Sequence, residues 1–207
     1  AKNSILEICK RPDLAAQVTS PPYHTMSTPE ARVMAGDNQN SFLRIDKPEL
    51  EFPDSSNPYD PQVYTRGKQN LEAFQKRGVL IRDASPCLYL YRQTMDGRRQ
   101  TGLLALTSVA EYNAGKIKKH EHTRPEKVND RANHIITSGS QASPVLSTFK
   151  WNADIARIFD AVQTKSPLID FVSSDQVRHE FWVIDDPRTI DQLVDAFATK
   201  LDCLYIA

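Results

Sequence analysis

One polar stretch, from Gly115 to Arg131, concentrates the residue types that could do chemistry. Its seventeen residues hold two histidines and six Lys/Arg against three acidic residues, with very little apolar content. Such a composition excludes a buried element and predicts a surface segment. Lys119 and Arg124 could clamp a phosphate group, and Thr123 stands at the expected start of a helix, where free backbone N–H groups favour an anion.

Groups that could move protons lie within the same stretch. Glu121 could act as a general base, and His120 or His122 as acid, base or metal ligand. We assign Glu121 and His120 as candidate catalytic residues and Lys119, Thr123 and Arg124 as candidate phosphate-binding residues. The secondary candidates are His122, Lys127, Arg131 and Tyr23.

Simpler interpretations of these residues stay open. A basic run is often only a solvated face, and Glu121 could do no more than pair with Lys119 or Arg124. His120 and His122 would share one face of a strand, but no third ligand at a known spacing accompanies them, so no metal site is predicted. The sequence has no Gly-rich phosphate loop and no dinucleotide fingerprint. The set suits phosphoryl transfer, which needs positioning and charge neutralisation more than a special nucleophile.

Charge and cysteine content narrow the class of protein. Lys+Arg and Asp+Glu balance at 26 each, which argues against a general nucleic-acid coat. From Trp151 to Ala207 there are ten acidic and five basic residues, a net charge of −5, so the rest carries +5. Three distant cysteines favour reduced thiols and a cytoplasmic location, and no apolar run reaches the length of a membrane span.

The elements that must position this stretch follow from periodicity and turn residues. The predicted fold class is α+β, a mixed and largely antiparallel sheet with flanking helices, because two hairpins interrupt the alternation of helices and strands. We expect residues 1–150 to form an N-terminal α+β region carrying the stretch, and residues 151–207 to begin a second one. Helices are predicted at 29–36, 61–77, 124–136, 153–162 and 187–197.

Strands are predicted at 41–45, 79–81, 87–95, 101–109, 144–149, 168–172, 177–184 and 203–206. Both strands of the 87–109 hairpin carry apolar residues on both faces, so we place them centrally, and the last strand is expected to be central and buried. Residues 47–60 are predicted to form a long loop without secondary structure. Thr123 is expected to cap the helix after it, with Glu126 completing a capping box.

The stretch Lys116–Arg131 also resembles the hallmark motif of the domain of unknown function 1015 family, which begins Ile-Lys-Lys-His-Glu. Supporting matches keep the family's order over nearly the whole chain; they include Pro22-Tyr23, Asn40 to Leu43, Tyr89 to Arg92 and Trp182 to Pro187. His24 departs from the family, which usually has Asp there. In the family the last strand runs into Asp-Gly-His-His-Arg, so the resemblance implies that this sequence is a piece that stops before part of the site.

The resemblance implies two alternative functions. Family members have been labelled similar to ParB-type partition proteins, and the ParB and sulfiredoxin-like superfamily includes a free serine kinase. The leading interpretation is a phosphate- or nucleotide-binding enzyme of phosphoryl-transfer type, kinase-like, with Mg²⁺ accompanying a nucleotide as an open cofactor option. The alternative is a ParB-like DNA-binding or regulatory protein without catalysis. The expected partner is a small phosphorylated ligand or nucleotide, nucleic acid is less favoured, and no membrane partner is expected.

Overall fold

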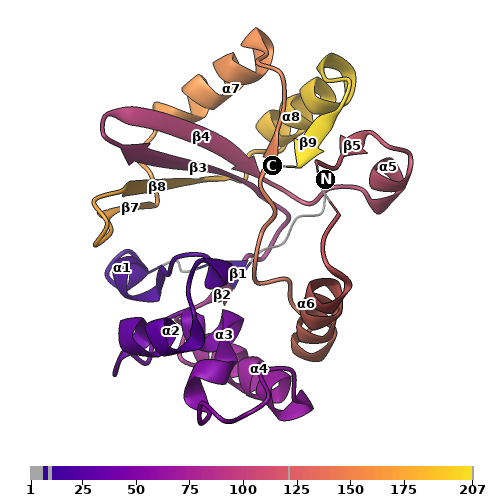
Figure 1. Cartoon of the computed structure of the whole chain (residues 1–207). Coiled ribbons are helices and arrows are strands. Elements are labelled where there is room, and N and C mark those ends of the chain that lie inside the picture. Colours follow the sequence, from indigo (N-terminus) through magenta and orange to yellow (C-terminus); the bar gives the residue numbers. More distant parts are fainter. Residues whose placement is uncertain (1–6, 9–10, 121, 207) are drawn as a thin grey trace. The chain divides into compact units, whose positions relative to one another are not determined.

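The computed structural model describes residues 7–8, 11–120 and 122–206 (Figure 1). Contacts between residues group the chain into two compact units. The first comprises residues 1–16, 81–120 and 145–207, and the second comprises residues 17–80 and 121–144. Both units are discontinuous in the sequence, and the regions 1–150 and 151–207 expected above stay a prediction. The α+β class is confirmed.

A four-stranded antiparallel sheet is the centre of the first unit. Its order is β4-β3-β8-β7, and its strands are β3 (Leu88–Met95), β4 (Arg98–Leu104), β7 (Ile169–Val172) and β8 (Arg178–Ile184). Asp96 and Gly97 join β3 to β4 with positive φ angles of 50° and 76°, as a tight hairpin turn requires. The prediction that both strands of this hairpin are central is wrong for β4, which is an edge strand and mostly exposed in its first half.

Two helices cover one face of this sheet (Figure 1): α7 (Ala153–Gln163) and α8 (Pro187–Lys200). Side chains at alternate positions of β3 and β8 point to them, because neighbouring strand residues face opposite sides of a sheet. The resulting core contains Leu88, Leu90, Ile155, Phe159, Val162, Trp182, Ile184, Ile190, Leu193 and Ala196. Asp186 caps α8 by accepting a hydrogen bond from the N–H of Thr189 at 2.9 Å.

Shorter strands complete the first unit. A three-stranded sheet of order β5-β9-β6 contains β5 (Ile117–Lys118), β9 (Leu204–Ile206) and β6 (Ser147–Thr148), and β1 (Glu7–Ile8) pairs with β2 (Ile81–Arg82). The strand β9 runs parallel to β5 and antiparallel to β6. The predicted last strand is therefore central, but it is not buried, because Tyr205 is exposed and its neighbours are half-buried. The helix α5 (Val109–Asn113) leads into β5.

The second unit is helical. Its elements are η1 (Tyr23–Thr25), α2 (Thr28–Ala35), α3 (Leu43–Asp46), η2 (Pro48–Glu51), α4 (Pro61–Lys76) and α6 (Pro125–Ser138), while α1 (Ala15–Val18) straddles the boundary. The predicted strand over 41–45 is wrong. Leu43 and Ile45 are both buried, but on a single helical turn rather than on one strand face.

The segment 47–60 is not structureless, which corrects the loop prediction. It contains η2, and Arg32 of α2 donates hydrogen bonds to the carbonyls of Leu50 and Phe52, both at 2.8 Å. Glu51 accepts from Arg44 at 2.8 Å and also from Arg66. Charge-assisted hydrogen bonds of this kind fix a loop more firmly than neutral ones.

The helix α4 matches its prediction closely, and Val63, Leu71 and Phe74 are buried as expected. Gly67 lies where α4 approaches its neighbours. A Cβ atom at this position would come within 3.1 Å of the Ile45 carbonyl oxygen and of a Pro48 ring carbon. The glycine therefore lets α3 and η2 pack directly on the backbone of α4.

Candidate functional site

The polar stretch singled out above runs from one unit into the other. Lys119 and His120 follow β5 in the first unit, and the residues from 121 onward belong to the second unit. The candidate base Glu121 lies outside the described residues. The candidates therefore divide into two sets, and each set is described within its own unit.

Lys119 and His120 lie where β5 ends. Because β5 and β9 are parallel, their carboxyl ends meet at the same edge of the small sheet. The ring Nδ1 of His120 lies 3.0 Å from the carbonyl oxygen of Ile206, the last described residue of β9. The ammonium of Lys119 lies 4.7 Å from the centre of the Tyr112 ring, a cation–π geometry, and both basic side chains are exposed. This edge thus presents one cation and one imidazole to solvent.

The start of α6 carries the second set. Pro125 is its first residue and Arg124 is the N-cap, so the predicted helix start is confirmed. The predicted capping box of Thr123 and Glu126 is wrong. No side chain among the described residues caps this helix. The physical reason is register, because Pro125 begins the helix one residue later than a Thr123 cap requires.

The side chains next to this helix start are exposed to solvent. His122, Thr123 and Arg124 are exposed, and Arg124 is 3.6 Å from Glu126 in an ion pair whose side chains are 72% and 57% exposed. Such a pair contributes little to stability. One turn on, the ammonium of Lys127 lies 3.4 Å from the Tyr59 hydroxyl and 5.8 Å from the centre of the Tyr59 ring. Two cations and a hydroxyl-bearing side chain therefore lie around the first turn of α6. Pro125 has no N–H, and the N–H groups of Lys127 and Val128 donate to the Arg124 carbonyl at 3.0 and 3.2 Å, so in this turn the Glu126 N–H is the one without a partner among the described residues.

Arg131 has a different environment from the other cations of the stretch, because it contacts two carboxylates and an aromatic ring. Its guanidinium donates to Asp46 at 3.2 Å and to Asp130 at 3.2 and 3.3 Å, and it stacks on the Tyr23 ring at 4.2 Å. Two carboxylates thus neutralise the charge that the sequence suggested for a phosphate. We interpret Arg131 and Tyr23 as parts of the structural core of this unit.

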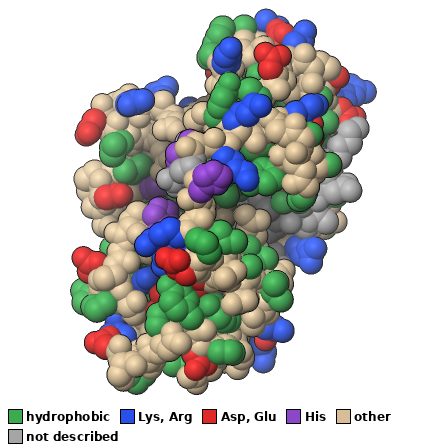
Figure 2. All heavy atoms as spheres, turned by 45° about the vertical axis from the view of Figure 1, so that its right-hand side comes forward, with side chains coloured by type: hydrophobic (Ala, Val, Ile, Leu, Met, Phe, Trp, Pro, Cys, Tyr) green, Lys and Arg blue, Asp and Glu red, His purple; other side chains and the backbone are tan. Residues whose placement is uncertain are grey.

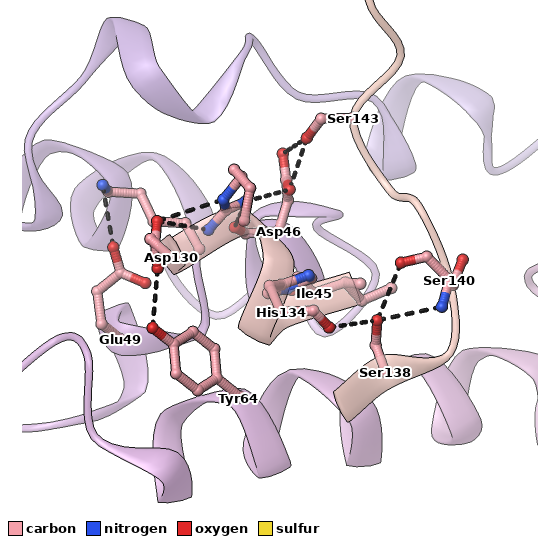
Figure 3. A network of polar contacts seen from close by, with 11 residues as sticks. Ile45, Asp46, Glu49, Tyr64, Asp130, His134, Ser138, Ser140 and Ser143 are labelled. Carbon is pink, nitrogen blue, oxygen red and sulfur yellow. Dashed lines mark hydrogen bonds and ion pairs between the residues drawn. The ribbon is translucent and has the colours of Figure 1, made fainter. Parts of the chain in front are cut away.

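Hydroxyl groups complete this network, which was not predicted from the sequence. The Ser143 hydroxyl lies 2.8 Å from both carboxylate oxygens of Asp46, and the Tyr64 hydroxyl donates to Asp130 at 3.0 Å (Figure 3). Burial and the Asp130 carboxylate together raise the pKa of Tyr64 to about 12, so it stays a donor. The only sequence signal was the adjacent Asp130-Arg131 pair, because the other members come from segments far away in the chain.

One further contact ties α6 to its neighbours. The ring Nε2 of the buried His134 lies 2.9 Å from the carbonyl oxygen of Ile45, and Ser138 donates to the carbonyl of His134 at 2.7 Å. The bond of His134 to Ile45 positions α6, and with it Arg124 and Lys127, against α3, whereas the bond of Ser138 lies within α6. In the part of the chain that the structure describes, no group of three or more His, Cys, Asp or Glu could hold a metal ion.

Comparison with known proteins adds the family. Residues 7–207 match the family described as "Protein of unknown function (DUF1015)". The chain belongs to this family. The resemblance seen in the polar stretch and its supporting matches is thereby confirmed. No curated protein and no solved structure matches the chain. Among the described residues of this family member, no helix has the length and apolar character needed to cross a bilayer.

Proposed function

We propose that this protein binds a small phosphorylated ligand, a phosphate ester or nucleotide, at the first turn of α6. The observation that carries the proposal is the pair of cations at this position. Arg124 and Lys127 flank the Glu126 N–H in the first turn of α6, and neither is held by a buried carboxylate among the described residues. Guanidinium and ammonium groups beside a backbone N–H at the positive end of a helix match the charge of a phosphate and offer donors to its oxygens.

Phosphoryl transfer is the reaction that this chemistry would serve. The transferred group needs charge neutralisation and alignment, which Arg124 and Lys127 would provide, and the hydroxyl of Thr123 would add a donor. Glu121 and His120 stay the predicted base and acid, and Lys119 stays a predicted further phosphate ligand. Magnesium ion bound with the nucleotide would neutralise the remaining charge.

The distribution of charge favours a small anion over a nucleic acid. Lys/Arg and Asp/Glu side chains are interspersed over the face shown in Figure 2. The sequence as a whole carries equal numbers of both signs. A strong nonspecific affinity for DNA needs several phosphate contacts along one basic surface. A single phosphate needs only the local pair of cations.

Calorimetric titration of ADP, ATP and phosphoserine tests the binding. The double variant Arg124→Ala/Lys127→Ala is compared with Lys68→Ala/Lys76→Ala, which removes two exposed cations from α4 in the same unit. Charge-assisted hydrogen bonds contribute about 1.5–3 kcal/mol each, so we expect at least a tenfold weaker Kd for the first variant only. Equal affinities in the two double variants would contradict the assignment.

The catalytic part is tested separately. Glu121→Gln should keep the affinity for ATP but lose phosphoryl transfer by a factor of about 10² to 10⁴, the usual contribution of a general base. A variant that binds and turns over like the original protein would remove Glu121 from the mechanism while leaving the binding site intact.

A further inference from the structure

A second group of reactive side chains lies in the first unit, at the turn between β7 and β8. It consists of Tyr91 on β3, Ser173 and Asp175 in the turn, and His179 on β8, and we call it the hairpin cluster. The turn is tight. The N–H of Ser173 donates to the Val177 carbonyl at 2.9 Å, and Gln176 adopts a φ of +66°. None of these residues belongs to the polar stretch.

The imidazole of His179 is fixed on every side. Its ring is stacked with Phe171 and with Tyr91, with centroid separations of 4.9 and 5.9 Å, and the residue is only 8% exposed. Nδ1 lies 2.6 Å from the Tyr91 hydroxyl, and Nε2 lies 2.8 Å from the Ser173 Oγ. A base in contact with a hydroxyl, and itself oriented by a third group, is the arrangement that activates a serine.

The positions of the protons determine which group donates and which accepts in the hydrogen bonds of Ser173, His179 and Tyr91. Ser173 has one hydroxyl proton and three neighbours that could accept it: Asp175 Oδ1, the Val177 carbonyl at 3.0 Å and His179 Nε2. When His179 carries its proton on Nδ1, it donates to Tyr91 and leaves the Nε2 lone pair facing Ser173. Rotation of the hydroxyl then places its proton on that lone pair.

The electrostatics of the cluster keep the imidazole neutral. Burial lowers the pKa of His179, although the nearby Asp175 carboxylate opposes this effect. Burial also raises the pKa of Tyr91 to about 12, so this hydroxyl orients the ring without ionising. A neutral imidazole at physiological pH can accept a proton.

We propose that Ser173 is a nucleophile toward activated carboxylic esters, with His179 as its general base and Tyr91 as the group that orients His179. The Ser173 Oγ forms a bond to the ester carbon while its proton passes to His179 Nε2. The bond from that carbon to the leaving oxygen breaks, and the leaving oxygen takes up the proton from His179. Attack by water on the acylated serine, with its proton following the same route, releases the acid and restores Ser173.

The hairpin cluster supports this role because its parts do more than close a turn. A turn of this kind needs only backbone hydrogen bonds and a residue that tolerates positive φ, both of which are present. The conformation of the turn does not require the stacked imidazole of His179 or its contact with Tyr91. Ser173 itself is half-buried at the end of the hairpin, where a small electrophile can reach it.

Covalent labelling with a fluorophosphonate tests the proposal on the full chain. The probe forms a bond between phosphorus and Ser173 Oγ and loses fluoride, and mass spectrometry of the peptide from Ser166 to Arg178 locates the adduct. We expect one adduct, on Ser173, with a rate that rises as His179 loses its proton. Ser173→Ala should abolish it, while Ser174→Ala, which removes the neighbouring exposed hydroxyl, should leave it unchanged.

Two variants separate the bases. His179→Gln should slow labelling at least tenfold, whereas Asp175→Asn should change the rate by less than threefold. Absence of an adduct on Ser173 in the folded original protein would overturn the proposal without any variant. Labelling that survives His179→Gln but fails in Asp175→Asn would overturn the role of His179.

Discussion

Each of the two units contains a buried ion-pair network, and the two networks are built differently. In the first unit, Glu180 on β8 is held by one guanidinium, that of Arg92 on β3, through two parallel hydrogen bonds of 2.7 and 2.5 Å. In the second unit, Arg131 is shared between Asp46 and Asp130 over longer distances, and Tyr64 and Ser143 also donate to those carboxylates. In the first network one close guanidinium makes both hydrogen bonds to the carboxylate, and the second network distributes its charge over several groups.

This difference shows how each unit tolerates the loss of a charge. Glu180 has a side chain only 6% exposed, and its other cation, Arg178, lies 3.7 Å away and is half-exposed. Losing Arg92 would leave a buried carboxylate almost alone. Asp46 and Asp130 would each keep a hydroxyl donor if Arg131 were lost. Arg92 also donates to the Gln163 side chain at 2.9 Å and contacts the Trp182 ring at 4.9 Å, much as Arg131 donates to the Asp46 carbonyl at 3.4 Å and contacts the Tyr23 ring at 4.2 Å.

The largest effect is expected for Arg92→Met. Removing one partner of a buried ion pair costs about 3–5 kcal/mol, because the other charge stays desolvated. Urea denaturation followed by Trp fluorescence measures it, since Trp182 lies beneath Arg92. Arg178→Met is the matched control, because it removes an exposed cation from the same sheet and should change stability very little. Equal losses of unfolding free energy in the two variants would show that Glu180 does not depend on Arg92 more than on Arg178.

A smaller effect is expected for Arg131→Met. We expect a loss of about 1–3 kcal/mol, since the hydroxyls of Ser143 and Tyr64 still satisfy part of each carboxylate. Hydrogen exchange of the α4 and α6 amides locates the loss in the second unit. Adding Tyr64→Phe should then cost more in the Arg131→Met background than alone, as expected for groups that share one acceptor. Strict additivity would show that the two donors act independently.

The smallest effect concerns pH and the hairpin cluster. The pKa of His179 is lower in the folded protein than its ordinary value of 6.5, so folding favours the neutral imidazole. The unfolded chain therefore binds more protons in this window, and stability should be complete above about pH 6.5 and fall as the pH drops through the folded-state pKa. Chemical denaturation between pH 5 and 8 measures the slope. His179→Phe should flatten it, and an unchanged slope would assign the pH dependence to other groups.

Local patterns in the sequence predicted most elements of this fold. Helices α2, α4, α6, α7 and α8 follow from their caps, prolines and apolar spacing, and both hairpins follow from alternation and turn residues. The predictions were wrong mainly for short elements. Leu43 and Ile45 are two positions apart, which is the spacing of one strand face, but both are buried on the single helical turn of α3.

The polar stretch was also visible in the sequence, and so was the family. The start of α6 and the exposure of Thr123 and Arg124 could be predicted from neighbouring residues, since Pro125 favours a helix start and the flanking sequence is polar. Lys127 likewise needs only its place in the first turn. These properties can be predicted from residues that are adjacent in the sequence.

Which polar groups contact one another depends on the tertiary structure. Asp46, Tyr64, Arg131 and Ser143 are far apart in the chain, and α3, α4 and α6 must pack before their side chains form one network. Tyr91 and His179 are 88 positions apart and meet because β3 and β8 are paired in one register. A shift of one residue in that register would turn His179 to the opposite face of the sheet, so the pairing of the strands, not the type of residue, creates the hairpin cluster.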